Sequence, residues 1–242
     1  MKNPRIYSAQ PLQAGTVVDL AENAANHVGR VLRMKVGESL VLFNGEGGAF
    51  QGKIALVSKK QIQVELEYVL EGNAESPLMI ELGQTLSRGE RMDYAIQKAT
   101  EAGVTSITPL FSERCEVKLN AERQEKQRSR LQQIAISACE QCGRNRVPVI
   151  HSPMKLEDWL ATRSTGLNFV LHHRTEKKLD GYDKPASVSL LIGPEGGLTT
   201  DEITLAESQR FAPLALGPRI LRTETAPVAA IALMQYLWGD WN

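Results

Sequence analysis

The sequence predicts an α/β protein, with a parallel-sheet α/β domain over residues 73–242 preceded by a small β-barrel over residues 1–72. In the longer domain, segments with the period of a helix alternate with short strand-like segments, which is typical of a parallel sheet. In the shorter domain, short strands separated by tight turns indicate a barrel. The polar, turn-forming residues 71–77 mark the boundary between them.

Three strands and one helix are expected in the first domain. The strands cover residues 39–43, 50–57 and 61–67, and the helix covers residues 24–34. The third strand alternates strictly between polar and apolar residues, as a half-buried strand does. The first two enclose a glycine-rich turn that a hairpin explains fully. The apolar side of the helix leaves His27, Arg30 and Arg33 on another face.

The second domain is expected to alternate between strands and helices. The strands cover residues 78–83, 104–110, 167–171, 188–192 and 213–216, and the helices cover residues 90–102, 121–142, 156–162, 201–208 and 227–238. Asn120 is a good N-cap for the longest helix, and Thr199 with Glu202 forms a capping box. Thr223 or Thr225 can cap the last helix, which is apolar nearly all round and is therefore expected to be buried.

Composition narrows the class of protein. The chain has 242 residues, 42% of them hydrophobic, which is enough for a packed core. It contains neither an apolar run long enough to span a membrane nor a secretory leader. Three cysteines without a leader indicate a reducing compartment, so we expect a cytoplasmic protein. The net charge of zero argues mildly against nucleic acid, but residues 1–35 carry five basic and two acidic side chains, enough for a local phosphate-binding face.

A glycine loop, Gly193 to Gly197, follows the apolar strand at residues 188–192 and precedes a helix. Ligands of open α/β sheets bind at such strand ends, and glycines let the backbone approach them closely. The loop carries the acidic Glu195 and has no lysine, so a bound phosphate would meet like charge there. An adenosine or a sulfonium would not meet this repulsion. A tight turn without any ligand explains this loop alone about equally well.

A second loop, Leu216 to Ala226, also joins a strand to a helix and contains a Gly-Pro pair. Its polar cluster, residues 222–225, has a simpler interpretation as a helix cap. Two strands of the same sheet each end in a Gly-Pro pair, which favours a shared ligand pocket over two turns without a ligand. No metal site is expected, because the pair Cys139 and Cys142 leaves only Cys115 and scattered histidines as further ligands.

These two loops resemble those of the SPOUT (α/β-knot) methyltransferases. The resemblance is greatest to the family that methylates N3 of a uridine in small-subunit (16S) ribosomal RNA. It extends over essentially the whole chain, least over residues 152–187, and its further segments are Pro4–Tyr7, His27–Arg33, Ser87–Met92, Gln97–Val104, Ser112–Cys115 and Cys139–Pro148. The resemblance implies an N-terminal PUA-like barrel that binds RNA and a C-terminal domain with a deep trefoil knot. It also implies S-adenosyl-L-methionine as cofactor, ribosomal RNA of the small subunit as partner, and a homodimer.

The resemblance also implies site residues. Those expected to bind the cofactor are Leu171, His172, Ile192, Gly193, Pro194, Glu195, Gly196, Gly197, Leu216, Gly217, Ile220, Leu221, Arg222, Thr223, Thr225 and Ala226. Those expected to bind RNA are Arg5, His27, Arg30, Arg33, Arg88, Arg114 and Arg146.

Four residues are expected to be catalytic: Arg222, Glu224, Arg144 and Glu140. Uracil N3 is a poor nucleophile until its proton leaves. Arg222, or Arg144 as second candidate, would hold the anionic base or a neighbouring phosphate. Glu224 or Glu140 would orient an arginine or accept the proton.

Two alternatives remain open at this point. One is a SPOUT methyltransferase that acts on another ribosomal or transfer RNA nucleotide. The other is a non-catalytic RNA-binding factor of ribosome assembly, in which the pocket is vestigial.

Overall fold

The computed structural model describes residues 3–58, 61–72, 74–117, 119–163, 166–172, 179 and 181–242. It divides into two compact units. The first unit comprises Met1–Glu75 and Ile136–Val147, and the second comprises Ser76–Ala135 and Pro148–Asn242. The domain boundary expected between residues 72 and 73 stays a prediction, and the first unit contains a second segment that the expectation did not include.

The first unit is built on one mixed five-stranded sheet. Its strands are β1 (Arg5–Tyr7), β2 (Val17–Asp19), β3 (Ser39–Phe43), β4 (Ala49–Val57) and β5 (Ile62–Val69), in the order β1-β3-β4-β5-β2. Only β1 and β3 pair in parallel among these strands, and β3 and β4 form the expected hairpin. The three predicted strands are confirmed. β1 and β2 were not predicted, because three residues are too few to show a period.

The predicted helix of the first unit is present in altered form. α1 (Glu22–Asn26) continues directly as a π-helical segment, η1 (His27–Val31). Val28 is fully buried, whereas His27, Arg30 and Arg33 are exposed as expected. Arg33 has a positive φ of 55°, a conformation that a residue with a side chain rarely adopts. The segment that carries the predicted RNA-binding residues is therefore irregular.

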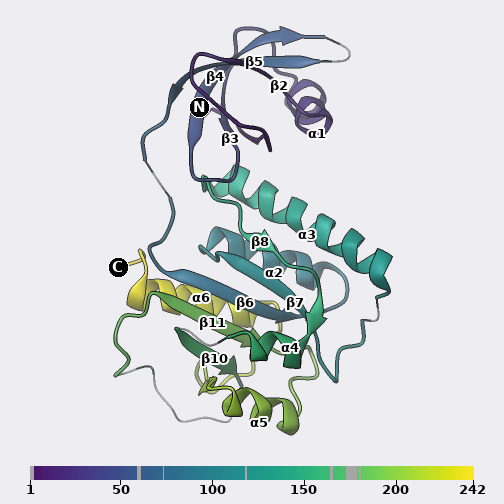
Figure 1. Cartoon of the computed structure of the whole chain (residues 1–242), viewed down its shortest axis with the longest axis vertical. Helices are drawn as coiled ribbons and strands as arrows, with labels where there is room; N and C mark the ends of the chain where they lie inside the picture. The colour runs from purple at the N-terminus through teal and green to yellow at the C-terminus, as the bar shows by residue number, and fades with distance from the viewer. Residues whose placement is uncertain are drawn as a thin grey trace. The chain divides into compact units, whose positions relative to one another are not determined.

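The second unit contains the predicted parallel sheet (Figure 1). Its strands are β6 (Met79–Thr85), β7 (Ser106–Phe111), β8 (Val149–Ile150), β9 (Met154–Lys155), β10 (Leu167–Leu171), β11 (Ser187–Ile192) and β12 (Ala212–Leu214). Its helices are α2 (Glu90–Glu101), α4 (Leu156–Ala161), α5 (Thr200–Ser208) and α6 (Thr225–Trp238), and α3 (Ala121–Cys142) runs from this unit into the second segment of the first. The main order is β12-β10-β11-β6-β7-β8, and every pair is parallel.

Helices cover both faces of this sheet. α2 and α6 pack together on one face, where Trp238 of α6 stacks on Phe169 of β10. α4 and α5 pack on the other, around a core that includes Trp159 and the next residue of β10, Val170. Successive residues of a strand point to opposite faces, so each strand contributes to both cores.

The predicted helix caps are confirmed at two helices and wrong at a third. Asn120 accepts a hydrogen bond from Arg123 N, and Thr199 with Glu202 forms the capping box of α5. α6 has no side-chain cap. The Thr223 hydroxyl instead donates to Gly193 O, in the loop after β11.

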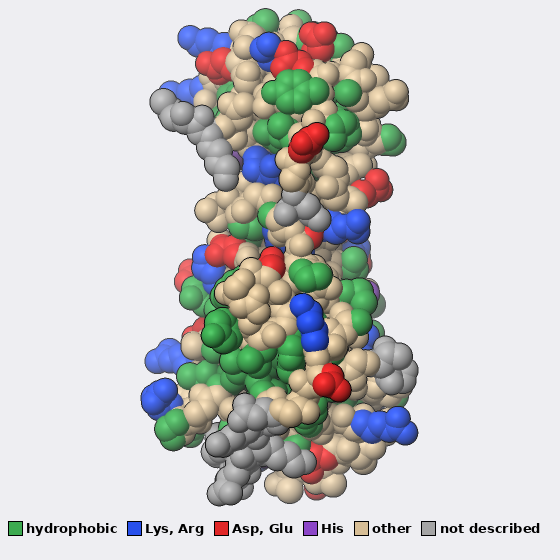
Figure 2. Space-filling model, turned by 90° about the vertical axis from the view of Figure 1, so that its left-hand side faces the viewer, with side chains coloured by type: hydrophobic (Ala, Val, Ile, Leu, Met, Phe, Trp, Pro, Cys, Tyr) green, Lys and Arg blue, Asp and Glu red, His purple; other side chains and the backbone are tan. Residues whose placement is uncertain are grey.

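The expectation that α6 is buried holds for only part of the helix. Ile231, Met234 and Trp238 are buried, but Tyr236 is 61% and Leu237 38% exposed. An apolar side of the helix therefore faces outward, and Figure 2 shows hydrophobic side chains gathered on the second unit. No helix among the described residues is long and apolar enough to cross a membrane.

A substitution of Gly83 on β6 tests the packing between the sheet and α4. A Cβ atom there would lie 2.8 Å from the Trp159 ring and 2.9 Å from Leu110 Cδ1. We expect Gly83→Ala to lower the free energy of unfolding by about 1–3 kcal/mol, measured by urea denaturation. Gly48→Ala is the control, because its Cβ would meet nothing closer than 3.5 Å. Equal stability of the two variants would contradict this packing.

Candidate active site

Two loops leave the carboxyl ends of the parallel strands in the second unit. One follows β11 and contains Gly193–Gly197. The other follows β12 and runs to α6. The strands β11 and β12 flank β10, so the two loops emerge on either side of the same strand. This edge of an open α/β sheet is where ligands bind.

The two loops enclose a cavity of about 680 Å³, within the size range of small-molecule sites. Its lining residues are Arg91, Arg114, Leu171, His172, Ile192, Gly193, Pro194, Glu195, Gly196, Gly197, Leu198, Thr200, Ile203, Leu214, Ala215, Leu216, Arg219, Ile220, Leu221, Arg222, Thr223, Glu224 and Ala226. The structure thus brings together most of the residues expected to bind a cofactor. Gly217 and Thr225 lie outside the lining.

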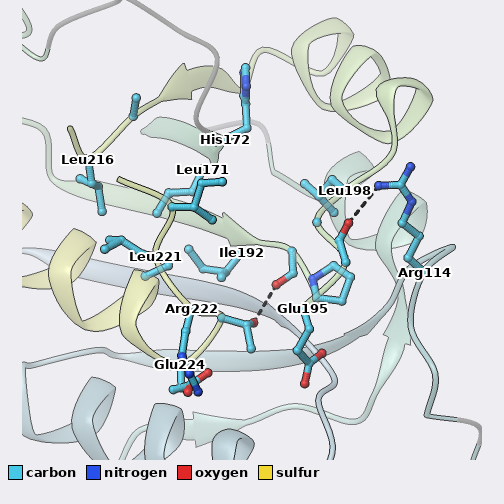
Figure 3. A pocket seen from close by; sticks show the side chains of 18 of the residues that line it. Arg114, Leu171, His172, Ile192, Glu195, Leu198, Leu216, Leu221, Arg222 and Glu224 are labelled. Carbon is cyan, nitrogen blue, oxygen red and sulfur yellow. Dashed lines mark hydrogen bonds between the residues drawn. The ribbon is translucent and has the colours of Figure 1, made fainter. Parts of the chain in front are cut away.

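The cavity has an apolar wall and a polar end (Figure 3). Leu171, Ile192 and Leu221 line the wall, whereas Arg222 and Glu224 lie beside one another at one end. The Oε2 atom of Glu224 is buried and has no hydrogen-bond partner among the described residues. An unpaired buried carboxylate oxygen is costly, so this end of the cavity is suited to a donor or a positive charge.

The first loop requires glycine at two positions. A Cβ atom on Gly193 would lie 2.9 Å from Leu198 Cγ and 3.0 Å from Leu198 N, so the chain turns back on itself there. Gly197 has a φ of 69°, in the left-handed region, and its N–H donates to Pro194 O at 2.9 Å. The glycines therefore serve a tight turn that also borders the cavity.

Three side chains from other segments hold this loop. Thr223 Oγ1 donates to Gly193 O at 2.8 Å, from the second loop. Arg114 Nη1 donates to Gly196 O at 2.9 Å (Figure 3), and Arg91 forms an ion pair with Glu195 at 2.8 Å. The hydrogen bond and charge of Glu195 raise the pKa of Arg91. Arg91 was not predicted as a site residue, since its contact with the loop spans 104 residues of sequence.

The charge around the first loop differs from the charge that the loop sequence predicts. Arg91 and Arg114 reach the loop from other segments, and Arg219 and Arg222 join them in the lining, against Glu195 and Glu224 as the two acidic residues. The cavity therefore carries more positive than negative side chains. Charge alone does not distinguish its ligand, and the apolar wall is the stronger argument for an adenosine.

Arg144 and Glu140, two of the residues expected to be catalytic, lie in the first unit. Arg144 is buried and pairs through Nη2 with Glu75 Oε2 at 2.7 Å. Glu140 accepts a hydrogen bond from Tyr7 N at 3.0 Å, and burial raises the pKa of its carboxyl although that hydrogen bond opposes the shift. Both therefore have partners within that unit, and their catalytic role stays a prediction.

The residues expected to bind RNA differ in their surroundings. Arg5 is half-buried and donates to Asn145 Oδ1 and Arg144 O. His27, Arg30, Arg33, Arg88, Arg114 and Arg146 are exposed. Of these, Arg88 pairs with Glu116, and Arg114 lies at the cavity.

The cysteine pair contains one thiol of low reactivity. Cys139 is fully buried, and burial raises its pKa to about 12. It is therefore protonated at neutral pH, whereas metal binding and redox chemistry need the thiolate.

Two family models match the chain. One, described as an RNA methyltransferase domain, matches residues 74–235, and the other, an RNA methyltransferase PUA domain, matches residues 20–67. The ribosomal RNA small subunit methyltransferase E of Buchnera aphidicola is 38% identical over 100% of this chain and 96% of its own length.

Two solved structures are similar over nearly their whole length. A proposed methyltransferase from Legionella pneumophila, with the cofactor S-adenosylmethionine bound, is 44% identical with a TM-score of 0.96, over 99% of this chain and 100% of its own. A ribosomal RNA small subunit methyltransferase E from Neisseria gonorrhoeae, also bound to S-adenosylmethionine, is 40% identical with a TM-score of 0.93, over 100% of both chains. The chain therefore belongs to the RNA methyltransferase family, and within it to the ribosomal RNA small subunit methyltransferases E.

Proposed function

We propose that this protein transfers a methyl group from S-adenosylmethionine to N3 of a uridine in small-subunit ribosomal RNA. The observation that carries the proposal is the cavity between the two loops, in a chain that matches S-adenosylmethionine-bound relatives over their full length. The target atom rests on the resemblance in sequence. A cytoplasmic location is part of the proposal and rests on cysteine usage and on this substrate.

The residues of the cavity fit this cofactor. The apolar wall formed by Leu171, Ile192 and Leu221 suits an adenine ring, and the glycine loop lets the backbone approach a ligand closely. The unpaired Oε2 of Glu224 suits a positive charge. When bound, S-adenosylmethionine supplies an electrophilic methyl group on a sulfonium.

Arg222 and Glu224 are the residues that we propose act on the uracil. A uracil that loses its N3 proton carries negative charge on O2 and O4, which the Arg222 guanidinium stabilises. The Glu224 carboxylate, whose Oε2 has no hydrogen-bond partner among the described residues, would accept a proton or orient Arg222. The pairing of Arg144 with Glu75 favours Arg222 over Arg144 for this role. Displacement of this kind depends chiefly on positioning, so the fixed loops contribute to the rate.

The exposed face of α1 and η1 is the RNA-binding surface that we propose for the first unit. His27, Arg30 and Arg33 are exposed there, and Val31 beside them is 67% exposed. The cations would contact phosphate, and the apolar side chains suit unstacked bases.

The outward side of α6 supports a homodimer. Ala229, Leu233, Tyr236 and Leu237 follow the spacing of one helix face and are at least partly exposed. An apolar stripe on a monomer marks an interface. A trefoil knot around the two loops belongs to the same proposal and rests on the resemblance.

The function is tested by methyl transfer to small-subunit RNA from a deletion strain, with the product nucleotide identified by mass spectrometry. Wild-type protein is expected to produce N3-methyluridine. Arg222→Ala and Glu224→Gln are each expected to lower kcat about 100-fold or more while cofactor binding persists, because each removes a group that acts in the transition state. Arg128→Ala on α3, a partly exposed arginine paired with Glu125, is the control.

A product methylated at another nucleotide would favour the alternative methyltransferases. Binding of RNA without binding of S-adenosylmethionine would favour the assembly factor. Near-normal turnover of both variants would remove Arg222 and Glu224 from the mechanism.

The RNA-binding surface is tested by reversing its charge. The double variant Arg30→Glu, Arg33→Glu is expected to weaken RNA binding about tenfold or more and to flatten its dependence on salt, because phosphate contacts are lost. Cofactor affinity should not change. Arg210→Glu, at the end of α5, is the control, and filter binding over a range of salt concentrations is the measurement. RNA affinity equal to wild type would exclude this surface.

The dimer is tested by sedimentation velocity. Leu237→Glu is expected to shift the protein to monomer, because it places a charge in the apolar interface. Val69→Glu on β5 makes the same change at a side chain that is 55% exposed, and should leave the dimer intact. A monomeric wild-type protein, or a dimeric Leu237→Glu protein, would contradict the proposed interface.

A further inference from the structure

A buried chain of hydrogen bonds links β6 to both loops of the cavity. Gln84, near the carboxyl end of β6, is only 1% exposed. Its Nε2 donates to Thr223 Oγ1 at 3.1 Å and lies 3.4 Å from Thr85 O. Thr223 Oγ1 in turn donates to Gly193 O at 2.8 Å, the hydrogen bond drawn beside Ile192 in Figure 3. Three segments far apart in sequence therefore meet at one hydroxyl group.

The direction of these hydrogen bonds is fixed by chemistry. A threonine hydroxyl has one hydrogen, and a backbone carbonyl only accepts. The hydrogen of Thr223 must therefore point to Gly193 O, and Gln84 must present its NH2 group to Thr223. An ionised carboxylate at position 84 has no hydrogen to give, so glutamate would not replace this glutamine.

The register of the sheet explains why Gln84 reaches this point. Gln84 lies directly opposite Ile192 in the parallel pair β6–β11, so both side chains point to the same face of the sheet. Ile192 lines the cavity and immediately precedes Gly193, whereas Gln84 does not border the cavity. Thr223 stands between Arg222 and Glu224.

The amide carries a cost as well as a benefit for stability. Gln84 Oε1 is buried without a hydrogen-bond partner among the described residues. A buried polar atom without a partner costs free energy, and this cost is set against the hydrogen bond that Nε2 makes with Thr223. Departures of this kind are expected where a residue serves a functional site.

We infer that Gln84 is a positioning residue: through Thr223 it fixes the two cofactor loops relative to each other, and with them Arg222 and Glu224. The inference rests on the proposed function for its effect on cofactor and rate. Its effect on the order of the loops is independent of that function.

The test compares Gln84→Met with Gln235→Met. Gln235 is a fully buried glutamine of the same unit, and its side chain bonds Ala102 O and Ser76 Oγ. In Gln84→Met we expect the Kd for S-adenosylmethionine to rise roughly 3- to 10-fold, the effect of one hydrogen bond, and kcat at saturating cofactor to fall about tenfold or more. Gln235→Met should lower Tm and leave Kd and kcat within about twofold of wild type.

Two further measurements separate positioning from stability. In the cofactor-free protein, the amides of residues 193, 195–197 and 221–226 should exchange hydrogen faster in Gln84→Met than in Gln235→Met. Gln84→Glu should bind cofactor weakly at pH 8 and recover toward pH 6, because burial raises the pKa of its carboxyl and the protonated form can donate to Thr223.

The outcomes distinguish the two proposals. If Gln84→Met lowers Tm but leaves Kd, kcat and loop exchange unchanged, Gln84 is merely structural and the inference fails. If Gln84→Met does not fold, the pH dependence of cofactor binding by Gln84→Glu decides whether the inference holds. A Kd for S-adenosylmethionine that does not change with pH overturns it. If wild-type protein does not bind S-adenosylmethionine, the proposed function fails, and loop exchange alone decides the role of Gln84.

Discussion

The hydrogen bond from Thr223 to Gly193 O is the constraint on which the geometry of the cavity depends. β11 ends at Ile192, so the Gly193 carbonyl lies just past the last sheet pairing of its strand. Buried backbone carbonyls need a partner, and here the partner comes from a loop 30 residues further along the chain. Arg91 and Arg114 tie the first loop to other segments, whereas this bond ties it to the second loop. With this bond, the end of the strand that carries Ile192 is joined directly to the loop that carries Arg222 and Glu224.

The hydroxyl of Thr223 also shows which kind of contact the sequence does not predict. Thr223 stands just before an apolar helix, and local pattern alone makes it a good cap. The structure uses it for a long-range contact instead, and α6 begins without a side-chain cap. Asn120 and Thr199 behave as predicted because their partners lie within three residues of them. Local contacts follow from spacing, whereas a contact across 30 residues depends on which strands pair.

The alternation of strands and helices was predictable for the same reason, since periodicity is a local property. The position of the two loops followed from it, because parallel strands bring their carboxyl ends to one edge. The arginines around the glycine loop did not follow, because Arg91 and Arg114 reach it from α2 and from the segment after β7. The sequence of α6 is apolar nearly all round, so its pattern alone does not say which side chains pack inside the chain and which, such as Tyr236 and Leu237, are exposed.

The contacts that hold the glycine loop differ in strength and in their response to conditions. The ion pair of Arg91 with Glu195 is about half exposed, and such pairs contribute little and weaken as salt is added. The bond from Thr223 is partly buried, and its support from Gln84 is buried. Low local dielectric strengthens hydrogen bonds of this kind and makes their loss costly. The loop is therefore fixed chiefly by the hydrogen bonds of Thr223 and Gln84, and the exposed ion pair of Arg91 adds less.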